Sequence, residues 1–349
     1  MNATPTASLA ADYRRHTRRR VGVLALFVLA LAASLAWDIT TGPSNFALGE
    51  LWAGLLDPAT LDPAQAVILW DVRLPYALMA VVVGASLGLA GAEMQTVLDN
   101  PLASPFTLGL AAAATFGAAL AIVLGVHLPA LGENLAVPLF AFLGAATATL
   151  LILSLTRIWG ASTEHVVLFG IALLFTFEAL VWLLQYVADA DTLQQIVFWT
   201  MGSLGRANWN NLTLVAVVLG AGLVLSLRQA WTLTALRAGE GQARSLGIAV
   251  ERLRLVVLMR VSLLAGCALA FVGTIGFVGL VGPHIARLAL GEDHRYYLPG
   301  SALAGALMLS LASIASKSLV PGVVLPIGIV TALVGVPLFL ALIVGRGRR

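Results

Sequence analysis

The feature that most constrains the fold is a succession of long apolar runs that carry almost no charge. They span about residues 21–37, 75–94, 105–126, 136–156, 166–187, 211–229, 254–274, 276–290, 299–316 and 326–345. A bilayer-spanning helix needs about 20 apolar residues, because each residue advances about 1.5 Å through a hydrocarbon core of about 30 Å. Only 11% of the 349 residues are charged, whereas a soluble domain has about a quarter. The sequence therefore predicts an all-α polytopic membrane protein with about ten transmembrane helices.

The stretch 254–290 is nearly continuous and has two interpretations. The glycines at 273, 276, 279 and 282, followed by Pro283, favour a break and a turn between two spans. The alternative is one long helix followed by a re-entrant segment. Elsewhere, small residues form ridges along the spans, as at 84–91 and 300–305, which favours close packing of helices.

The charges between the spans predict the orientation of the chain. An even number of spans places both ends on one side, and the positive-inside rule assigns the more basic side to the cytoplasm. That side receives Arg14, Arg15, Arg18, Arg19, Arg20, Arg157, Arg228, Arg237, Arg244, Arg252, Arg254, Arg287, Arg295, Arg346, Arg348 and Arg349; the other receives only Arg73, Arg206 and Lys317. We expect a basic cytoplasmic segment at 1–20, a single transmembrane domain at 21–349, cytoplasmic termini and an inner-membrane location. A cleaved signal peptide is less favoured, because the run 21–37 is long and lacks a small-x-small cleavage site.

Two segments on the outer side, 45–56 and 192–202, mix apolar and polar residues at helical spacing. They are expected either to form helices on the membrane surface or to be packed loops.

The chain carries no recognisable catalytic or metal-binding motif. Its one cysteine, Cys267, lies within an apolar run and is expected to be buried, and its five histidines lack the spacing of a metal site. Its single lysine, Lys317, is not preceded by the glycines of a Walker A loop. We therefore expect no enzyme activity, metal or cofactor in this chain. If transport is driven by ATP, the nucleotide and its Mg²⁺ must bind a separate ATPase chain.

The longest polar stretch between the spans is about 235–253, on the side assigned to the cytoplasm. The pattern predicts a short helix that Gly239 and Gly241 open, that runs from Ala243 to Leu246 and that Gly247 closes. Such a helix could be held by a partner protein. The alternative is an ordinary solvated loop.

This stretch, Gly239-Glu240-Gly-Gln-Ala-Arg244-Ser-Leu-Gly247, resembles the coupling-helix motif of FecCD-type permeases, the importers of ferric siderophores, haem and cobalamin. From about residue 70 to the C-terminus, further motifs resemble the same family in the same order. They are Arg73-Leu-Pro75, Gly91-Ala-Glu-Met-Gln95, Asn100-Pro-Leu-Ala-Ser-Pro105, Gly276-Phe-Val-Gly-Leu-Val-Gly-Pro-His-Ile-Ala-Arg287, Asp293-His-Arg295 and Leu325-Pro-Ile-Gly328.

The resemblance implies a type II ABC importer permease that forms a homodimer or a closely related heterodimer. Two cytoplasmic ATPase subunits would grip the coupling segment, and an outer solute-binding protein would deliver the cargo. A ferric siderophore is the leading cargo, with haem or cobalamin as the alternative. The implied coupling residues are Arg237, Gly239, Glu240, Ala243, Arg244, Ser245, Leu246 and Gly247.

The resemblance also implies a docking site for the binding protein. In the family, outer basic residues pair with acidic residues of that protein, and Arg73 and Lys317 match two such positions. Other positions depart from the family pattern: Tyr76 stands where a second arginine is common, Val324 replaces a glutamate, and Ser313 replaces an aspartate. The alternative role for Arg73 and Lys317 is that of topology or snorkelling charges.

Glu178 is a charged residue in the middle of the fifth span, where a charge is costly unless it faces a cavity or a partner. That span lines the translocation pathway in the family, so the resemblance implies pathway roles for Gly170, Leu173 and Glu178. The alternative is a structural contact of Glu178 with a neighbouring helix, for example with Arg260. A different class of function, an ion-coupled secondary transporter with Glu178 as its ion site, also fits this residue. Glu93, near a helix end, is expected to be structural.

Overall fold

The structure, a computed structural model, describes residues 5–42, 48–126, 135–160 and 162–346. These residues form helices joined by turns, with one isolated β-bridge between Val320 and Val323. The all-α fold predicted from the sequence is confirmed.

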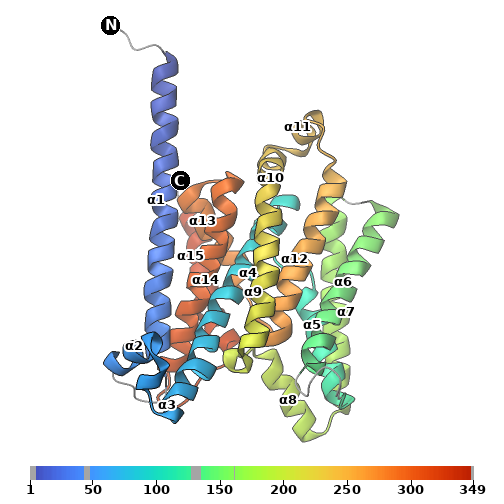
Figure 1. The fold of residues 1–349 in the computed structure, drawn as a ribbon. Helices are drawn as coiled ribbons and strands as arrows, with labels where there is room; N and C mark the ends of the chain where they lie inside the picture. The colour runs from blue at the N-terminus through green and yellow to red at the C-terminus, as the bar shows by residue number, and fades with distance from the viewer. Residues whose placement is uncertain (1–4, 43–47, 127–134, 161, 347–349) are drawn as a thin grey trace.

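Among the described residues, seven helices are long and apolar enough to cross a bilayer, and three shorter apolar helices accompany them (Figure 1). The long ones are α1 (Pro5–Thr40), α4 (Leu74–Val97), α6 (Ala136–Trp159), α7 (Thr163–Val187), α9 (Trp209–Arg228), α12 (Val250–Val272) and α14 (His294–Ser318), and the shorter ones are α5 (Leu110–Val123), α13 (Val278–Leu290) and α15 (Ile327–Arg346). Together they agree with the predicted number of about ten.

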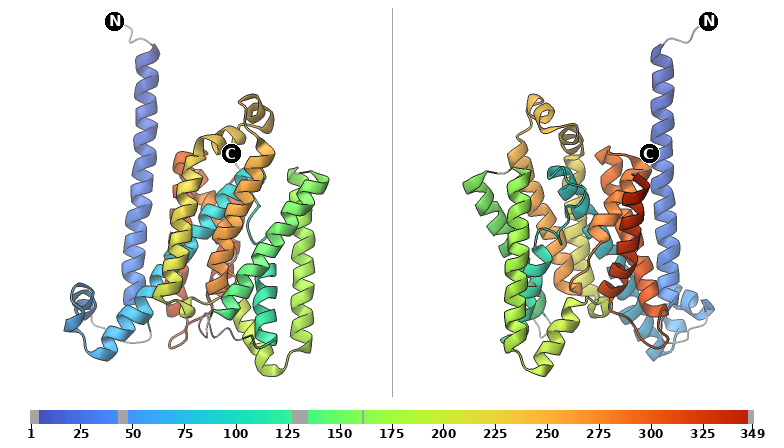
Figure 2. Two further views of the ribbon diagram at one scale, coloured as in Figure 1. Left: turned by 45° about the vertical axis from the view of Figure 1, so that its right-hand side comes forward. Right: turned by 180° about the vertical axis from the view of Figure 1, so that it is seen from behind.

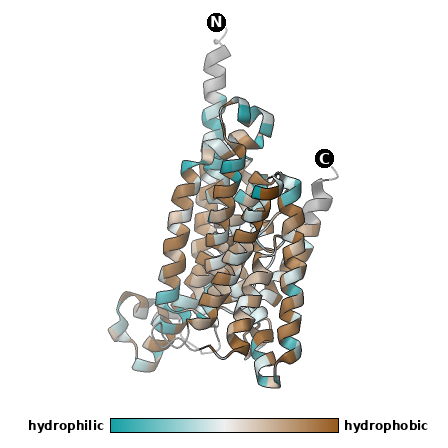
Figure 3. Ribbon diagram, turned by 90° about the vertical axis from the view of Figure 1, so that its right-hand side faces the viewer, coloured by the Kyte–Doolittle hydropathy of each residue, from teal (hydrophilic) through white to brown (hydrophobic). Residues whose placement is uncertain are grey.

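Short elements gather at the two ends of the bundle (Figures 1 and 2). One end holds α10 (Ala230–Arg237), α11 (Glu240–Ser245) and the ends of α1 and α15 that lead to the termini; we call it the coupling end. The opposite end holds α2 (Leu48–Leu56), η1 (Pro58–Thr60), α3 (Pro63–Val67), η2 (Ile68–Arg73), α8 (Ala190–Thr200) and η4 (Leu204–Arg206). Figure 3 shows an apolar band between two more hydrophilic ends, which is the pattern that a bilayer imposes.

The two segments expected at the outer surface contain the helices α2 and α8, so the loop alternative is wrong where the structure describes them; residues 45–47 lie outside the described part. Helix α1 begins earlier than the expected start at residue 21. Pro5 occupies its first turn, and no glycine or proline follows before Gly22, so the basic residues continue the same helix.

The small-residue ridges bring three helices into backbone contact. A Cβ added at Gly84 would lie 2.4 Å from the carbonyl oxygen of Gly305, and one at Gly88 would lie 2.2 Å from that of Ser301. A Cβ at Gly91 would lie 1.8 Å from the carbonyl oxygen of Gly279. These positions therefore admit only glycine, and α4 packs directly against α13 and α14.

Two non-helical stretches interrupt the bundle. Residues 98–109 leave α4 and lead to α5, which is shorter than the predicted span 105–126 because Pro101, Pro105 and a left-handed Gly109 (φ +77°) keep this stretch out of the helix. Residues 273–277 separate α12 from α13, beginning with a left-handed Gly273 (φ +79°). The stretch 254–290 thus forms two helices, as the glycine pattern predicted.

Candidate functional site at the coupling end

The predicted short helix exists as α11 and stands at the coupling end, outside the main bundle (Figure 1). Gly239 precedes it at φ +128° and Gly247 follows it at φ +81°, conformations that favour glycine. Gly241 lies within the helix and does not open it. Ala243 is buried against the bundle, whereas Leu246 is 53% exposed. The solvated-loop alternative is wrong, and α11 presents an exposed surface on a fixed base.

Arg254 fixes α11 to the bundle. Its side chain is 2% exposed and forms an ion pair with Glu240, the first residue of α11. Its Nε also donates to the carbonyl oxygen of Val97 at 2.9 Å, and its Nη2 to Oγ1 of Thr163 at 3.2 Å. One guanidinium group therefore joins α11 and α12 to the end of α4 and the start of α7.

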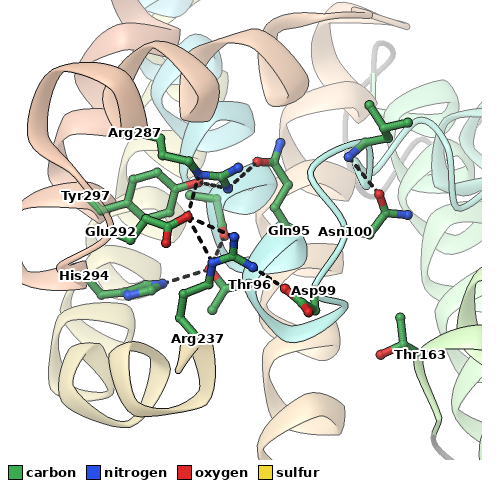
Figure 4. Close-up of polar contacts among 12 residues, drawn as sticks. Gln95, Thr96, Asp99, Asn100, Thr163, Arg237, Arg287, Glu292, His294 and Tyr297 are labelled. Atoms are coloured by element: carbon green, nitrogen blue, oxygen red, sulfur yellow. Dashed lines mark hydrogen bonds and ion pairs between the residues drawn. The ribbon is translucent and has the colours of Figure 1, made fainter. Parts of the chain in front are cut away.

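Arg237, at the end of α10, makes a second junction (Figure 4). It forms an ion pair with Asp99, in the non-helical stretch after α4, and its Nε donates to Glu292 at 3.0 Å, between α13 and α14. Asp99 itself has a left-handed backbone (φ +41°). Arg237 thus links the residues just before α11 to the stretch 98–109.

Helices α13 and α14 join the same polar network (Figure 4). The Nη2 of Arg287 donates to Gln95 at 3.0 Å and to the hydroxyl of Tyr297 at 3.1 Å, and Arg287 forms an ion pair with Glu292 at 3.3 Å. The buried His294 ring contacts Oγ1 of Thr96 at 2.8 Å and Oγ1 of Thr234 at 3.1 Å.

Asp293 connects this network to α1. It caps α14 by accepting a hydrogen bond from the Arg295 backbone, and it pairs with the side chains of Arg295 and Arg20. The hydrogen bond from the Arg295 side chain, above all, holds the pKa of Asp293 below its ordinary value. The carboxylate therefore stays charged at a more acidic pH than an isolated aspartate does, and its ion pair with Arg20 holds α1 against the bundle.

A buried ion pair lies deeper in the bundle. Glu93 of α4 is fully buried, and Nε of Arg260 in α12 donates to its Oε2 at 2.8 Å. The Nη1 of Arg260 donates to Gln229 at 3.0 Å. The structural role expected for Glu93 is confirmed. The alternative pairing of Glu178 with Arg260 is wrong, because the Arg260 side chain bonds to Glu93 and Gln229 and, among the described residues, makes no contact with Glu178.

At the opposite end, Arg73 and Lys317 are buried and bonded within the chain. Lys317 Nζ lies 2.6 Å from Oδ1 of Asp38, which also accepts a hydrogen bond from Ser313 at 2.8 Å. Arg73 donates to the backbone carbonyl oxygens of Ile39 at 2.9 Å and Thr40 at 3.2 Å. In this conformation both cations fasten the end of α1 to α4 and α14.

The three residues expected in the pathway lie in different surroundings. A Cβ at Gly170 would clash with Leu108, so Gly170 lets the stretch 98–109 approach α7. Leu173 packs against buried apolar residues of two clusters. Glu178 lines a cavity of about 230 Å³.

The comparisons with known proteins decide the family. The FecCD transport family matches residues 26–345, which is nearly the whole chain. The chain belongs to the FecCD transport family. The hemin transport system permease HmuU of Yersinia pestis is 36% identical over 331 residues, covering 95% of this chain and 96% of the relative. The vitamin B12 import system permease BtuC of Escherichia coli is 36% identical over 336 residues, covering 96% and 97%.

A solved structure agrees with this assignment. An ABC transporter described as of the metal-chelate type, in an inward-facing conformation, superposes with a TM-score of 0.81 and 32% identity, covering 93% of this chain and 99% of that one. The chain is thus a multi-pass ABC permease, and the expected resemblance is confirmed.

The sequence motifs of this FecCD permease indicate α11, Arg237 and Glu240, but not the residues that Arg237 and Glu240 contact. The sequence predicts only topology charges at Arg254 and Arg287, whereas the structure buries their side chains to 2% and 9% exposure. Asp99, Glu292 and His294 are 138, 55 and 60 residues away from the groups they contact. Contacts between residues so far apart in the sequence cannot be read from one sequence, so the network could not be predicted from residue spacing.

Proposed function

We propose that this chain is the membrane-spanning subunit of an ATP-driven importer of iron chelates, with a ferric siderophore as its cargo. Haem or cobalamin, the substrates named for its relatives, are the alternative within the family. One observation carries the proposal: α11 is exposed at one end of the bundle and is bonded through Arg254 to α4, α7 and α12. The sequence contains no Walker A motif, which supports the proposal that a separate chain hydrolyses ATP.

The proposed assembly contains a second permease copy, two ATPase subunits that grip α11, and an outer binding protein at the opposite end. The positive-inside rule supports this orientation, because the arginine-rich coupling end would face the cytoplasm of a bacterial cell. Movement of α11 by the ATPases would be transmitted through Arg254 and Arg237 to α4, α7 and the stretch 98–109. Each nucleotide state would then favour one access state of the permease, since a ligand shifts an equilibrium only by its differential affinity.

Replacing Gly239–Gly247 by a flexible Gly-Ser linker should abolish co-purification of the ATPase subunits, because an unstructured linker presents no fixed surface. The measurement is the ATPase-to-permease ratio after affinity purification. Residues 57–62, at the opposite end, provide a matched control whose replacement should leave the ratio unchanged. Retention of stoichiometric ATPase by the α11 replacement would contradict the proposal.

We also propose that Lys317 and Arg73 receive acidic groups of the binding protein once their internal bonds open. Because Asp38 competes for Lys317, Asp38→Asn should speed capture of the binding protein and Lys317→Gln should slow it, each by about two- to tenfold at low salt. Surface plasmon resonance on the nanodisc-embedded complex measures both rates. Equal on-rates in the two variants would exclude this docking role.

A further inference from the structure

We propose that Glu178 forms the cargo-selecting element of the pathway, and that it favours chelates whose rim carries ammonium groups or N–H donors over chelates whose rim carries carboxylates. This inference rests on the proposed transport function, because it assigns the cavity beside Glu178 to the route of the cargo.

The first observation is that the Glu178 carboxyl group is not used by the fold. It lines a cavity of about 230 Å³ between α5, α7, the end of α8 and the two non-helical stretches. Among the described residues, no side chain or backbone group forms a hydrogen bond or an ion pair with it. The buried acid Glu93 of α4 differs, since Arg260 neutralises it. A mid-membrane carboxyl group is costly unless it has a partner or water, so Glu178 fits a position exposed to the contents of the pathway.

The second observation concerns the hydroxyl groups of the same cavity. Thr115, Thr200 and Thr274 line it, and each hydroxyl donates its proton to a backbone carbonyl oxygen. Thr115 donates to Ala111 at 2.9 Å and Thr200 donates to Val197 at 2.7 Å. Thr274 donates to the carbonyl oxygen of Thr200. A hydroxyl that has donated its proton retains only acceptor lone pairs. These three side chains therefore offer acceptors to a ligand.

Two aromatic side chains complete the cavity. Phe106 is 45% exposed and Trp182 is 62% exposed, and both line the space beside Glu178. Aromatic faces attract cations through their negative quadrupole. Among the side chains that line the cavity, only the Trp182 indole carries an N–H group. A carboxylate, three acceptor hydroxyls and two aromatic rings together match a ligand that supplies donors or positive charge.

The charge preference can be measured without knowing the cargo. Leu174 lines the same cavity one helical turn before Glu178, and the only cysteine, Cys267, is buried. In a Cys267→Ala background, Leu174→Cys places a single thiol beside Glu178. This thiol is then reacted with a cationic reagent, trimethylammonium-ethyl methanethiosulfonate, and with an anionic one, sulfonato-ethyl methanethiosulfonate. The two reaction rates are compared in the nanodisc-embedded complex, with and without nucleotide.

We expect the cation-to-anion rate ratio to fall about tenfold or more when Glu178→Gln is added, because a nearby unit charge acts in opposite directions on the two reagents. Glu178→Asp should preserve the ratio. Glu164→Gln, an exposed acid in the first turn of the same helix, is the matched control and should leave it unchanged. An unaltered ratio in Glu178→Gln, or a thiol that neither reagent reaches in any nucleotide state, would overturn the inference.

Transport provides the second readout. A ferric trihydroxamate that ends in an ammonium group and its carboxylate-capped analogue are compared in wild type, Glu178→Gln and Glu178→Lys with the same binding protein, whose own selectivity then cancels. The ammonium-to-carboxylate uptake ratio should fall several-fold in Glu178→Gln and further in Glu178→Lys. Unchanged uptake ratios would contradict the role of Glu178. Absence of ATP-driven uptake of any chelate would instead contradict the proposed function, and the thiol-reaction rates would then decide this inference.

Discussion

Glu93→Ala should lower the free energy of unfolding by about 3–5 kcal/mol, because it leaves the buried Arg260 guanidinium without its carboxylate. The Arg260 side chain is 5% exposed, and Gln229 would remain as a neutral partner only. The measurement is reversible unfolding of the purified permease in mixed micelles with increasing SDS.

The matched variants separate the lost ion pair from a general loss of packing. Glu164→Ala, an exposed acid of α7, should change stability by less than about 0.5 kcal/mol. The double variant Glu93→Leu with Arg260→Met should recover most of the loss, since apolar residues of similar volume replace buried pairs with little cost. A change below about 1 kcal/mol in Glu93→Ala would show that this pair does not hold α4 against α12.

Arg254→Ala should uncouple ATP hydrolysis from transport. The ATPases should remain bound, because α11 keeps its exposed surface, but α11 would lose its bonds to the end of α4 and the start of α7. One lost hydrogen bond from a charged group costs about 1.5–3 kcal/mol, and about 1.4 kcal/mol corresponds to a tenfold change in rate. We expect chelate uptake to fall at least about tenfold while ATP hydrolysis stays within about twofold, both measured in proteoliposomes.

Two neighbouring variants make this result specific. Arg254→Lys should also lose uptake, because an ammonium group cannot reproduce the fork of donors that reaches Glu240, Val97 and Thr163. Arg252→Ala, two residues earlier on the same helix and exposed, should transport normally. If Arg254→Ala transports as well as Arg252→Ala, the transmission through Arg254 is wrong.

The fold was predictable from the sequence where bilayer physics acts on one segment at a time. Apolar runs and the distribution of arginine residues are sufficient to predict most of the helices and the grouping of the start of α1 and the end of α15 with α11. The apolar run predicts the start of α5 five residues too early, because hydropathy carries no information about how Pro101 and Pro105 restrict the backbone.

The partners of individual side chains were less predictable, since they depend on contacts between distant segments. The family pattern shows that serine replaces the usual aspartate at position 313. It does not show that Asp38 of α1, 275 residues away, brings a carboxylate into contact with Ser313. Glu178 was recognisable as an anomaly, yet its surroundings came only from the fold, which brings Thr115, Thr200 and Thr274 around it.

The most direct test of this account is chelate uptake by proteoliposomes that contain the permease, its ATPase and its binding protein. Uptake should require ATP on the side of α11 and should persist when an ionophore collapses the ion gradients. Uptake that continues without nucleotide and stops with the ionophore would contradict it, and would identify an ion-coupled transporter instead.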